Sequence, residues 1–277
     1  MNIEHHLLDK AVADIQKTSK TSGAFKEGLP DTLVLHYTAS ASASSAIKTF
    51  LDPDVAVSAH IVIDRDGSVT QLLPFNETGW HAGKSAWKDR TSLNQYSIGI
   101  ELVNAGKLMK TGAVWRSWFG KEYPENEVMQ AVHKNESSLS GWHIFTEEQI
   151  EATFQLCRSL LKEYPITYIL GHDDISPGRK VDPGPAFPLD KLRDRLSKGG
   201  RKEDDEPEVY SSDKRYGTVD VRALNIRSGP GTSHSTITAP LSNGTRVSIL
   251  SEDKEWMEVE VPIRGWVAKR FIKEGGE

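Results

Sequence analysis

Cysteine is almost absent from this sequence, since Cys157 is the only one among 277 residues. A single cysteine cannot form an internal disulfide, so the fold does not depend on an oxidising compartment. A closed structural zinc site built from several cysteines is excluded for the same reason. Cys157 itself falls on an apolar stripe, which predicts a small buried side chain rather than a reactive thiol.

Long apolar runs and an excess of positive charge are also missing. No stretch approaches the ~18 apolar residues of a membrane-spanning helix. The first residues, Met1 to His6, lack the basic region and apolar core of a signal peptide. The net charge of −5 argues against nucleic acid or an acidic membrane as the main partner. The sequence leaves the oligomeric state open.

The length and a change in composition predict two domains. A chain of 277 residues is longer than one typical domain. Residues 197–215, SKGGRKEDDEPEVYSSDKR, combine dense charge with almost no large apolar side chain, which predicts a flexible linker. We therefore expect a first domain at 1–196, with an N-terminal extension at 1–30, and a second domain at 216–277.

The first domain alternates apolar strands with helices. Strands are expected at 32–37, 61–63, 69–73, 97–103 and 168–170, and a short helix at 42–51. A longer helix begins at Thr146, where Gln149 three residues later completes a capping box. Its apolar stripe consists of Ile150, Phe154, Cys157 and Leu161. This alternation predicts an α/β domain with a mixed β-sheet flanked by helices.

The stretch GHDDISPGRKVDPG at 171–184 is the most informative part of the chain. His172 follows an apolar strand, and a Pro177-Gly178 turn lets the chain double back to present Asp182. His36 stands at the end of an earlier apolar run. Two imidazoles and one carboxylate make a three-ligand Zn²⁺ site whose fourth position is free for water, which is the pattern of a catalytic zinc.

Four further motifs accompany that stretch in a fixed order: LHYTAS at 35–40, SAHIVIDRDG at 58–67, GWHAG at 79–83 and SIGIEL at 97–102. Together, from about residue 30 to 196, they resemble the zinc-dependent N-acetylmuramoyl-L-alanine amidases. These share a fold with phage lysozyme-type amidases, muropeptide-recycling amidases and peptidoglycan recognition proteins. The resemblance implies Zn²⁺ on His36, His172 and Asp182. It also implies hydrolysis of the amide between N-acetylmuramic acid and L-alanine in peptidoglycan or muropeptides.

The resemblance also implies which residues transfer the proton, stabilise the oxyanion and line the substrate cleft. Glu101 matches the catalytic glutamate of recycling-type amidases, a general acid/base. Lys180 matches the lysine that meets the oxyanion. Ala59 replaces the catalytic tyrosine of lysozyme-type amidases, which favours the arrangement with Glu101. His81 and Trp80 fall where the family lines its substrate cleft, although loop packing explains His81 equally well.

For three further parts of the sequence, the residues allow two structural or functional interpretations. His60 lies on an alternating strand, which favours a packed, hydrogen-bonded residue over a fourth metal ligand. Asp173 and Asp174 beside His172 are expected to cap the loop or to orient the imidazole. The long segment 104–145 carries several aromatic side chains, which either pack the segment or form a wall for sugar rings.

The second domain shows short alternating strands separated by turns. These strands are expected at 219–221, 224–226, 247–250, 257–261 and 265–267. The pattern predicts a small all-β barrel. The phrases LNIRSGPGT at 224–232 and RGWVAKRFI at 264–272 resemble bacterial SH3-like domains. That resemblance implies either binding to wall peptides or glycans, or a tethering role without wall affinity.

Two other functions fit the same fold. One is a cytoplasmic amidase that recycles anhydro-muropeptides, and the other is a non-catalytic peptidoglycan recognition protein. The full ligand set with Glu101 and Lys180 favours an enzyme, and the SH3-like domain favours polymeric wall. Without a signal peptide, we expect a cytoplasmic protein or one released to the wall by a non-classical or phage-type route, as an endolysin is.

Overall fold

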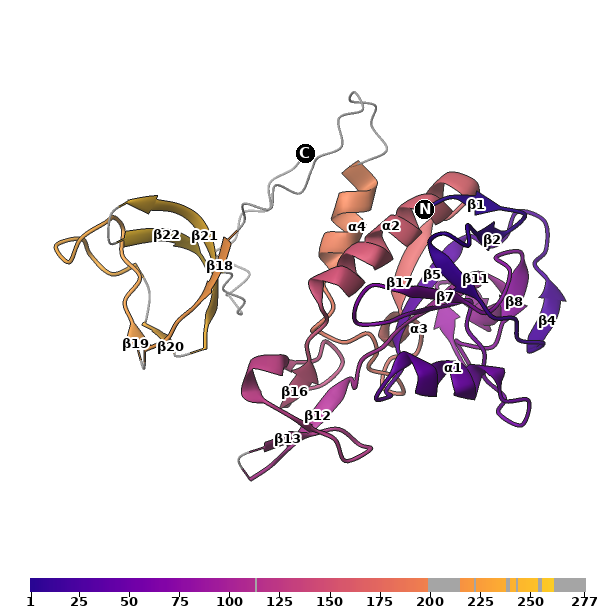
Figure 1. Ribbon diagram of the computed structural model, residues 1–277, viewed down its shortest axis with the longest axis horizontal. Coiled ribbons are helices and arrows are strands. Elements are labelled where there is room, and N and C mark those ends of the chain that lie inside the picture. Colours follow the sequence, from indigo (N-terminus) through magenta and orange to yellow (C-terminus); the bar gives the residue numbers. More distant parts are fainter. Residues whose placement is uncertain are drawn as a thin grey trace. The chain divides into compact units, whose positions relative to one another are not determined.

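The computed structural model describes residues 1–112, 114–198, 215–221, 223–237, 240–242, 244–253 and 256–261. The chain divides into two compact units, Met1–Lys202 and Glu203–Glu277, which are drawn in Figure 1. Among the residues described, none of the helices has the length and apolar character needed to span a membrane. The expected boundaries at 196 and 216 stay predictions, and most of the expected linker lies outside the described residues.

The first unit contains many short strands and four α-helices. Its strands are β1 (Ile3–Glu4), β2 (Leu7–Leu8), β3 (Ala13–Ile15), β4 (Thr21–Ala24), β5 (Thr32–Tyr37), β6 (Ile61–Ile63), β7 (Val69–Gln71), β8 (Glu77–Gly79), β9 (Ala86–Trp87), β10 (Arg90–Thr91), β11 (Ser97–Leu102), β12 (Lys107–Thr111), β13 (Val114–Arg116), β14 (Glu122–Tyr123), β15 (Val128–Val132), β16 (Leu139–His143) and β17 (Tyr168–Gly171). Its helices are α1 (Ala43–Leu51), α2 (Glu147–Glu163), α3 (His172–Ile175) and α4 (Leu189–Lys198), with 3₁₀ turns at Leu93–Gln95 and Glu125–Glu127. All five strands and both helices expected from the sequence are present, within a few residues of their predicted bounds.

A six-stranded mixed sheet forms the centre of the first unit, in the order β17-β5-β11-β6-β7-β3. The strands β17, β5, β11 and β6 are parallel. β7 runs antiparallel to β6, and β3 runs parallel to β7. The predicted α/β class with a mixed sheet is confirmed. Because these four parallel strands lie side by side, their carboxyl ends meet at one edge of the sheet.

One face of this sheet is covered by α2 and α4 (Figure 1). Alternate side chains of the central strands, such as Leu35 and Ile100, join Phe154 and Leu192 of the helices in one buried cluster. Cys157 is fully buried in the same cluster, as its place on the apolar stripe predicted. The predicted capping box at the start of α2 is also present, and such an N-cap is worth about 1 kcal/mol of stability.

The opposite face of the sheet carries α1, a small buried cluster that includes Val34 and Leu170, and the polar residues at the strand ends. The helix α1 packs Ala46 and Phe50 against Val62 of β6. Its N-cap is Ser42, whose hydroxyl accepts a hydrogen bond from the backbone of Ser45. Since α1 covers only the β6 side of this face, the ends of β5, β11 and β17 remain for the candidate site.

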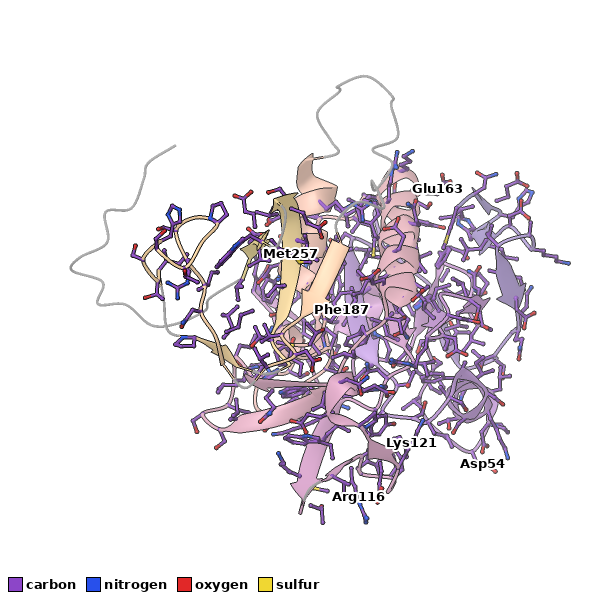
Figure 2. The ribbon with its side chains drawn as sticks, turned by 60° about the vertical axis from the view of Figure 1, so that its left-hand side comes forward. Asp54, Arg116, Lys121, Glu163, Phe187 and Met257 are labelled. Atoms are coloured by element: carbon purple, nitrogen blue, oxygen red, sulfur yellow. The ribbon has the colours of Figure 1, made fainter. Side chains whose placement is uncertain are left out.

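The segment between β11 and α2 forms a second sheet, with the order β14-β13-β12-β16-β15. Its Trp115, Tyr123 and Trp142 side chains are buried, so these aromatic rings pack the segment. Trp118 is 71% exposed, and the sugar-wall interpretation stays open for it. Figure 2 labels Arg116 on β13 and Lys121 in the connection between β13 and β14, far from Glu163 at the end of α2.

The described part of the second unit consists of strands. They are β18 (Arg215–Thr218), β19 (Ala223–Leu224), β20 (Leu241–Ser242), β21 (Arg246–Asp253) and β22 (Trp256–Glu260). β18, β21 and β22 form one antiparallel sheet, and β19 pairs with β20. The strand expected at 219–221 is wrong, because β18 ends at Thr218 and Val219 follows it as a buried residue bonded to Gly244 and Thr245. The strand expected at 265–267 lies outside the described residues.

Candidate metal centre

Three neighbouring parallel strands bring the predicted site residues to one level of the sheet. His36 is the fifth residue of β5, and Glu101 of β11 is its partner in the strand register. Gly171 of β17 is paired with Leu35, so His172 follows at the level of His36. The side chains of His36 and Glu101 therefore share a face, opposite the face that α2 covers.

The loop after α3 returns Asp182 to the same place. The backbone N–H of Asp173 donates to the carbonyl of Asp182 at 2.8 Å, and this hydrogen bond holds the end of the loop next to the start of α3. Between them, the Ser176 carbonyl accepts hydrogen bonds from the backbones of Arg179 and Lys180. The Arg179 side chain donates to the carbonyl of Lys84 at 2.8 Å and so fixes the loop against the 79–85 segment.

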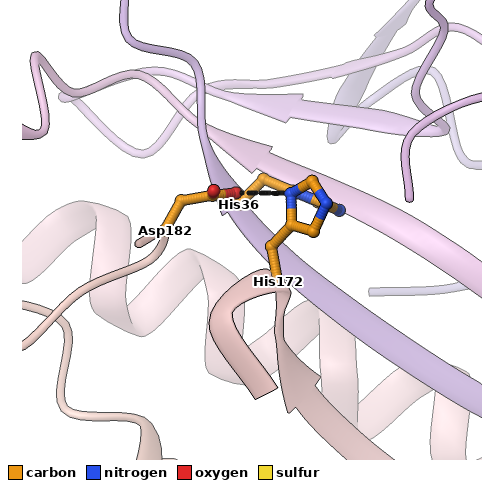
Figure 3. A group of neighbouring side chains, drawn as sticks. All are labelled: His36, His172 and Asp182. Atoms are coloured by element: carbon orange, nitrogen blue, oxygen red, sulfur yellow. Dashed lines mark hydrogen bonds and ion pairs between the residues drawn. The ribbon is translucent and has the colours of Figure 1, made fainter. Parts of the chain in front are cut away.

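His36, His172 and Asp182 converge on one point, as Figure 3 shows. The two Nδ1 atoms are 2.9 Å apart, and each lies 2.9–3.0 Å from Oδ2 of Asp182. The centre of such a triangle is about 1.7 Å from each corner, so one ion just off its plane can reach all three atoms at the roughly 2.0–2.2 Å typical of zinc bonds to N and O. The three side chains are buried. The donor set and its spacing therefore fit a single divalent cation.

The other nitrogen of each imidazole has its own protein partner. Nε2 of His36 lies 3.0 Å from Nδ1 of His81. Nε2 of His172 lies 3.1 Å from the carbonyl oxygen of Ala82 and 3.2 Å from a guanidinium nitrogen of Arg179. Both inner nitrogens are thereby left facing the carboxylate of Asp182.

The electrostatics of the group favour a neutral His36 imidazole beside an ionised Asp182 carboxylate. Burial and the neighbouring His172 lower the pKa of His36 to about 4, against the opposing effect of Asp182. Burial opposes ionisation of Asp182, but the close contacts with the imidazoles of His172 and His36 outweigh it and hold the pKa of Asp182 below its usual range. Neutral His and ionised Asp are the forms that bind a metal.

Glu101 is a buried carboxyl group beside this centre. Burial raises the pKa of Glu101 to about 8, the charge of Asp182 adds to the shift, and Lys180 opposes it. Its Oε2 has no hydrogen-bond partner among the described residues. A buried carboxyl group with a free oxygen and a raised pKa is a typical proton-transfer group. Lys180 is half-buried, and its charge also lowers the pKa of His36.

His81, Trp80 and His60 lie around the centre rather than in it. Both ring nitrogens of His81 contact protein groups, His36 and the Ser97 carbonyl, and the residue is 8% exposed. Trp80 is half-buried, and its indole N–H donates to Ser22. Contacts of Trp80 and His81 with substrate stay a prediction. His60 accepts from Gly99 and donates to the Glu77 carbonyl, so it is a packed residue, as its alternating strand favoured.

The acidic pair after His172 has two separate tasks. Asp174 caps α3, since its carboxylate accepts from the backbone of Gly171 at 2.7 Å. Asp173 binds His133 and Lys134 of the second sheet's hairpin. The expected capping role is therefore found, but the outer nitrogen of the His172 imidazole contacts the Ala82 carbonyl and Arg179 instead of either carboxylate. A backbone carbonyl carries no side-chain signal, so sequence patterns gave no means of finding it.

Comparisons with known proteins give a family match for each of the two parts of the chain. Residues 26–185 match the family model described as N-acetylmuramoyl-L-alanine amidase, and residues 222–273 match that of the bacterial SH3 domain. The crystal structure of a selenomethionine AmpD derivative shares the fold of the first unit, with a TM-score of 0.52 and 25% identity. The aligned region covers 71% of this chain and 99% of the AmpD chain. The predicted all-β, SH3-like class of the second domain is thereby confirmed together with the amidase fold.

Two curated relatives come from Escherichia coli (strain K12). N-acetylmuramoyl-L-alanine amidase AmiD is 34% identical over 169 residues, which are 58% of this chain and 51% of AmiD. The 1,6-anhydro-N-acetylmuramyl-L-alanine amidase AmpD is 33% identical over 144 residues, which are 51% of this chain and 60% of AmpD. The chain thus spans between half and two thirds of the length of these relatives. Since the family model matches more than half of its residues, the chain belongs to the N-acetylmuramoyl-L-alanine amidase family.

Proposed function

We propose that this protein is a zinc-dependent amidase that hydrolyses the bond between the lactyl carboxyl group of N-acetylmuramic acid and the amino group of L-alanine. The observation that carries the proposal is the buried triangle of two Nδ1 atoms and one carboxylate oxygen, with the carboxyl group of Glu101 on the next strand. Three protein ligands leave a fourth position for water or substrate, as catalytic zinc sites do.

His36, His172 and Asp182 would hold the zinc ion. When bound, zinc lowers the pKa of a water molecule towards about 7 and polarises the scissile carbonyl. Since the residues are already buried and close together, little rearrangement of the protein is needed to bind the ion.

Glu101 would move the proton. As a carboxylate it accepts a proton from the attacking water, and as a carboxylic acid it delivers that proton to the departing nitrogen of L-alanine. The C–N bond breaks, and the products are a free lactyl carboxylate and a peptide with a new amino terminus. The pKa of Glu101, raised to about 8 by burial, suits a group that must both accept and donate near neutral pH.

Lys180 would stabilise the oxygen that becomes negatively charged during the reaction. Its charge already influences both His36 and Glu101. A positive charge held near the developing oxyanion typically contributes a factor of about 10²–10³ in rate. Trp80, which precedes His81 on the same loop, is proposed to contact the substrate through the exposed part of its side chain.

The proposed substrate class is N-acetylmuramoyl-peptide, polymeric or soluble. The name of AmpD specifies a 1,6-anhydro sugar, so recycling of soluble anhydro-muropeptides is the second candidate function. The match to a bacterial SH3 domain favours the polymeric wall instead, because a wall-binding domain raises the local concentration of substrate.

The experiment compares three substrates: purified sacculi, a soluble muropeptide with an intact sugar, and its 1,6-anhydro form. Mass spectrometry of the products should show a peptide that begins with free L-alanine. Release from sacculi supports wall hydrolysis, whereas release from the anhydro form alone supports recycling. Binding of sacculi without any release would support the non-catalytic recognition protein and contradict the proposal.

A further inference from the structure

In both candidate zinc-binding imidazoles, the Nε2 atom contacts one of two neighbouring residues of the same loop. Nε2 of His36 meets Nδ1 of His81 at 3.0 Å, and Nε2 of His172 meets the carbonyl of Ala82 at 3.1 Å. Histidines that bind metals usually make such a second hydrogen bond, which fixes both the ring orientation and the tautomer. Here His81 contacts the ring of His36, and the next residue, Ala82, contacts the ring of His172.

The positions of the protons on the rings of His81 and His36 follow from one carbonyl group. Nε2 of His81 lies 3.1 Å from the carbonyl oxygen of Ser97, which can only accept. Nε2 of His81 must therefore carry the proton, and Nδ1 of the neutral ring is an acceptor. His36 must then donate from Nε2, which leaves a lone pair on its Nδ1. Nε2 of His172 has two neighbours of opposite kind, the Ala82 carbonyl at 3.1 Å and the Arg179 guanidinium at 3.2 Å, so its tautomer is not fixed in the way that the tautomer of His36 is.

The consequence is seen at the metal site itself. Nδ1 of His36 presents its lone pair 2.9 Å from Nδ1 of His172 and 2.9 Å from Oδ2 of Asp182. A lone pair that faces a carboxylate oxygen is repelled by it, and a cation placed between the two removes the repulsion. The hydrogen bond at His81 thus prepares Nδ1 of His36 for an ion.

The ring of His81 is itself held firmly. A Cβ at Gly99 would lie 2.4 Å from Cγ of His81, so this ring lies directly against a strand position that only glycine leaves open. The backbone N–H groups of His81 and Ala82 both donate to Oδ1 of Asn94, at 3.1 and 2.7 Å. The GWHAG and SIGIEL motifs therefore fit together at Gly99.

We propose that His81 is a positioning residue for the metal centre. Its Nε2 donates to the Ser97 carbonyl, so its Nδ1 accepts from Nε2 of His36, and this hydrogen bond leaves Nδ1 of His36 free to bind zinc. The inference rests on the proposed zinc site and goes beyond it by assigning His81 a role through His36. Loss of a hydrogen-bond partner of this kind typically weakens metal affinity about 10–100-fold.

The test is zinc affinity of the full chain, measured by competition with a chromophoric chelator. His81→Leu removes the hydrogen bond, and we expect zinc binding to weaken about 10–100-fold. His81→Gln offers one acceptor and one donor on its amide, so its affinity should lie closer to that of the wild type. His143→Gln is the control, because His143 is equally buried but contacts Ala105 and Tyr123 instead of the centre. Affinity of His81→Leu within about twofold of the wild type, or equal weakening in His81→Leu and His81→Gln, would overturn the proposal.

A second measurement needs no variant at position 81. In the metal-free wild type, ¹⁵N chemical shifts of labelled histidine report which ring nitrogen of His36 is protonated, with His36→Ala used for assignment. We expect the proton on Nε2, and a proton on Nδ1 would overturn the proposal. If the wild type binds no zinc, the proposed function fails, while the tautomer measurement still decides on the role of His81.

Discussion

Glu101 and His36 are register partners on adjacent parallel strands, so a buried carboxyl group and a candidate zinc ligand project from the same level of the sheet. The spacing of neighbouring strands, about 4.8 Å, fixes their separation without any loop between them. A proton-transfer group placed on rigid strands keeps its geometry relative to the metal through the reaction.

The first prediction concerns the carboxyl group of Glu101. Glu101→Gln should bind zinc as the wild type does, while kcat falls by about 10²-fold or more, because an amide cannot accept the proton of water. Zinc content and steady-state rates on a soluble muropeptide measure the two effects. Glu163→Gln, at the exposed end of α2, is the matched control. An unchanged kcat in Glu101→Gln would assign the proton transfer to another group.

The second prediction is a dependence of stability on pH in the metal-free protein. The pKa of Glu101 is raised from 4.5 to about 8 in the fold, so the folded state holds a proton that the unfolded state loses above pH 4.5. The contribution of Glu101 to stability is therefore greatest below that pH and declines as the pH rises to about 8. Glu101→Gln cannot ionise. Its melting temperature relative to the wild type should rise between pH 5 and pH 8 and then level off, and a constant difference would contradict the raised pKa.

The third prediction concerns Lys180. Lys180→Met should retain zinc and lower kcat by about 10²–10³-fold, because a charge near the developing oxyanion is lost. Lys191→Met, which removes an exposed lysine of α4, serves as the control. A change confined to KM would show that Lys180 contributes to substrate binding alone.

The motifs predicted the strands and the clustering of the metal centre well, for a physical reason. An apolar run ending in a polar residue, such as 32–37 with His36, places that residue at a strand end, and parallel strands bring their ends together. The alternation of Ser97, Gly99 and Glu101 with apolar neighbours likewise showed which side chains leave the core.

Other features depend on contacts that residue patterns do not encode. The Ala82 and Ser97 carbonyls act through the backbone, so their residue types carry no signal. The second sheet between β11 and α2 is built from short strands that pair only with one another, and its aromatic residues gave no period. The role of His81 required the distance between its ring and His36.

The fourth prediction concerns the C-terminal unit. A chain ending at Lys202, the last residue of the first compact unit, should keep its zinc and its rate on a soluble muropeptide. On insoluble sacculi its rate should fall further, since a tethered wall-binding domain raises the local substrate concentration. The measurement is the ratio of rates, full length against 1–202, on the two substrates. Equal losses on both would show that the C-terminal unit supports the amidase fold, and no loss on either would remove the wall-targeting role.

The most direct test of the central claim is zinc content measured together with turnover, for the wild type and His172→Ala. The account predicts about one zinc ion per wild-type chain, loss of activity when a chelator removes it, and recovery when zinc is returned. His172→Ala should lose both zinc and activity, because one of three ligands is gone. Full turnover by the metal-free wild type, or normal zinc content and turnover in His172→Ala, would contradict the assignment of the metal centre.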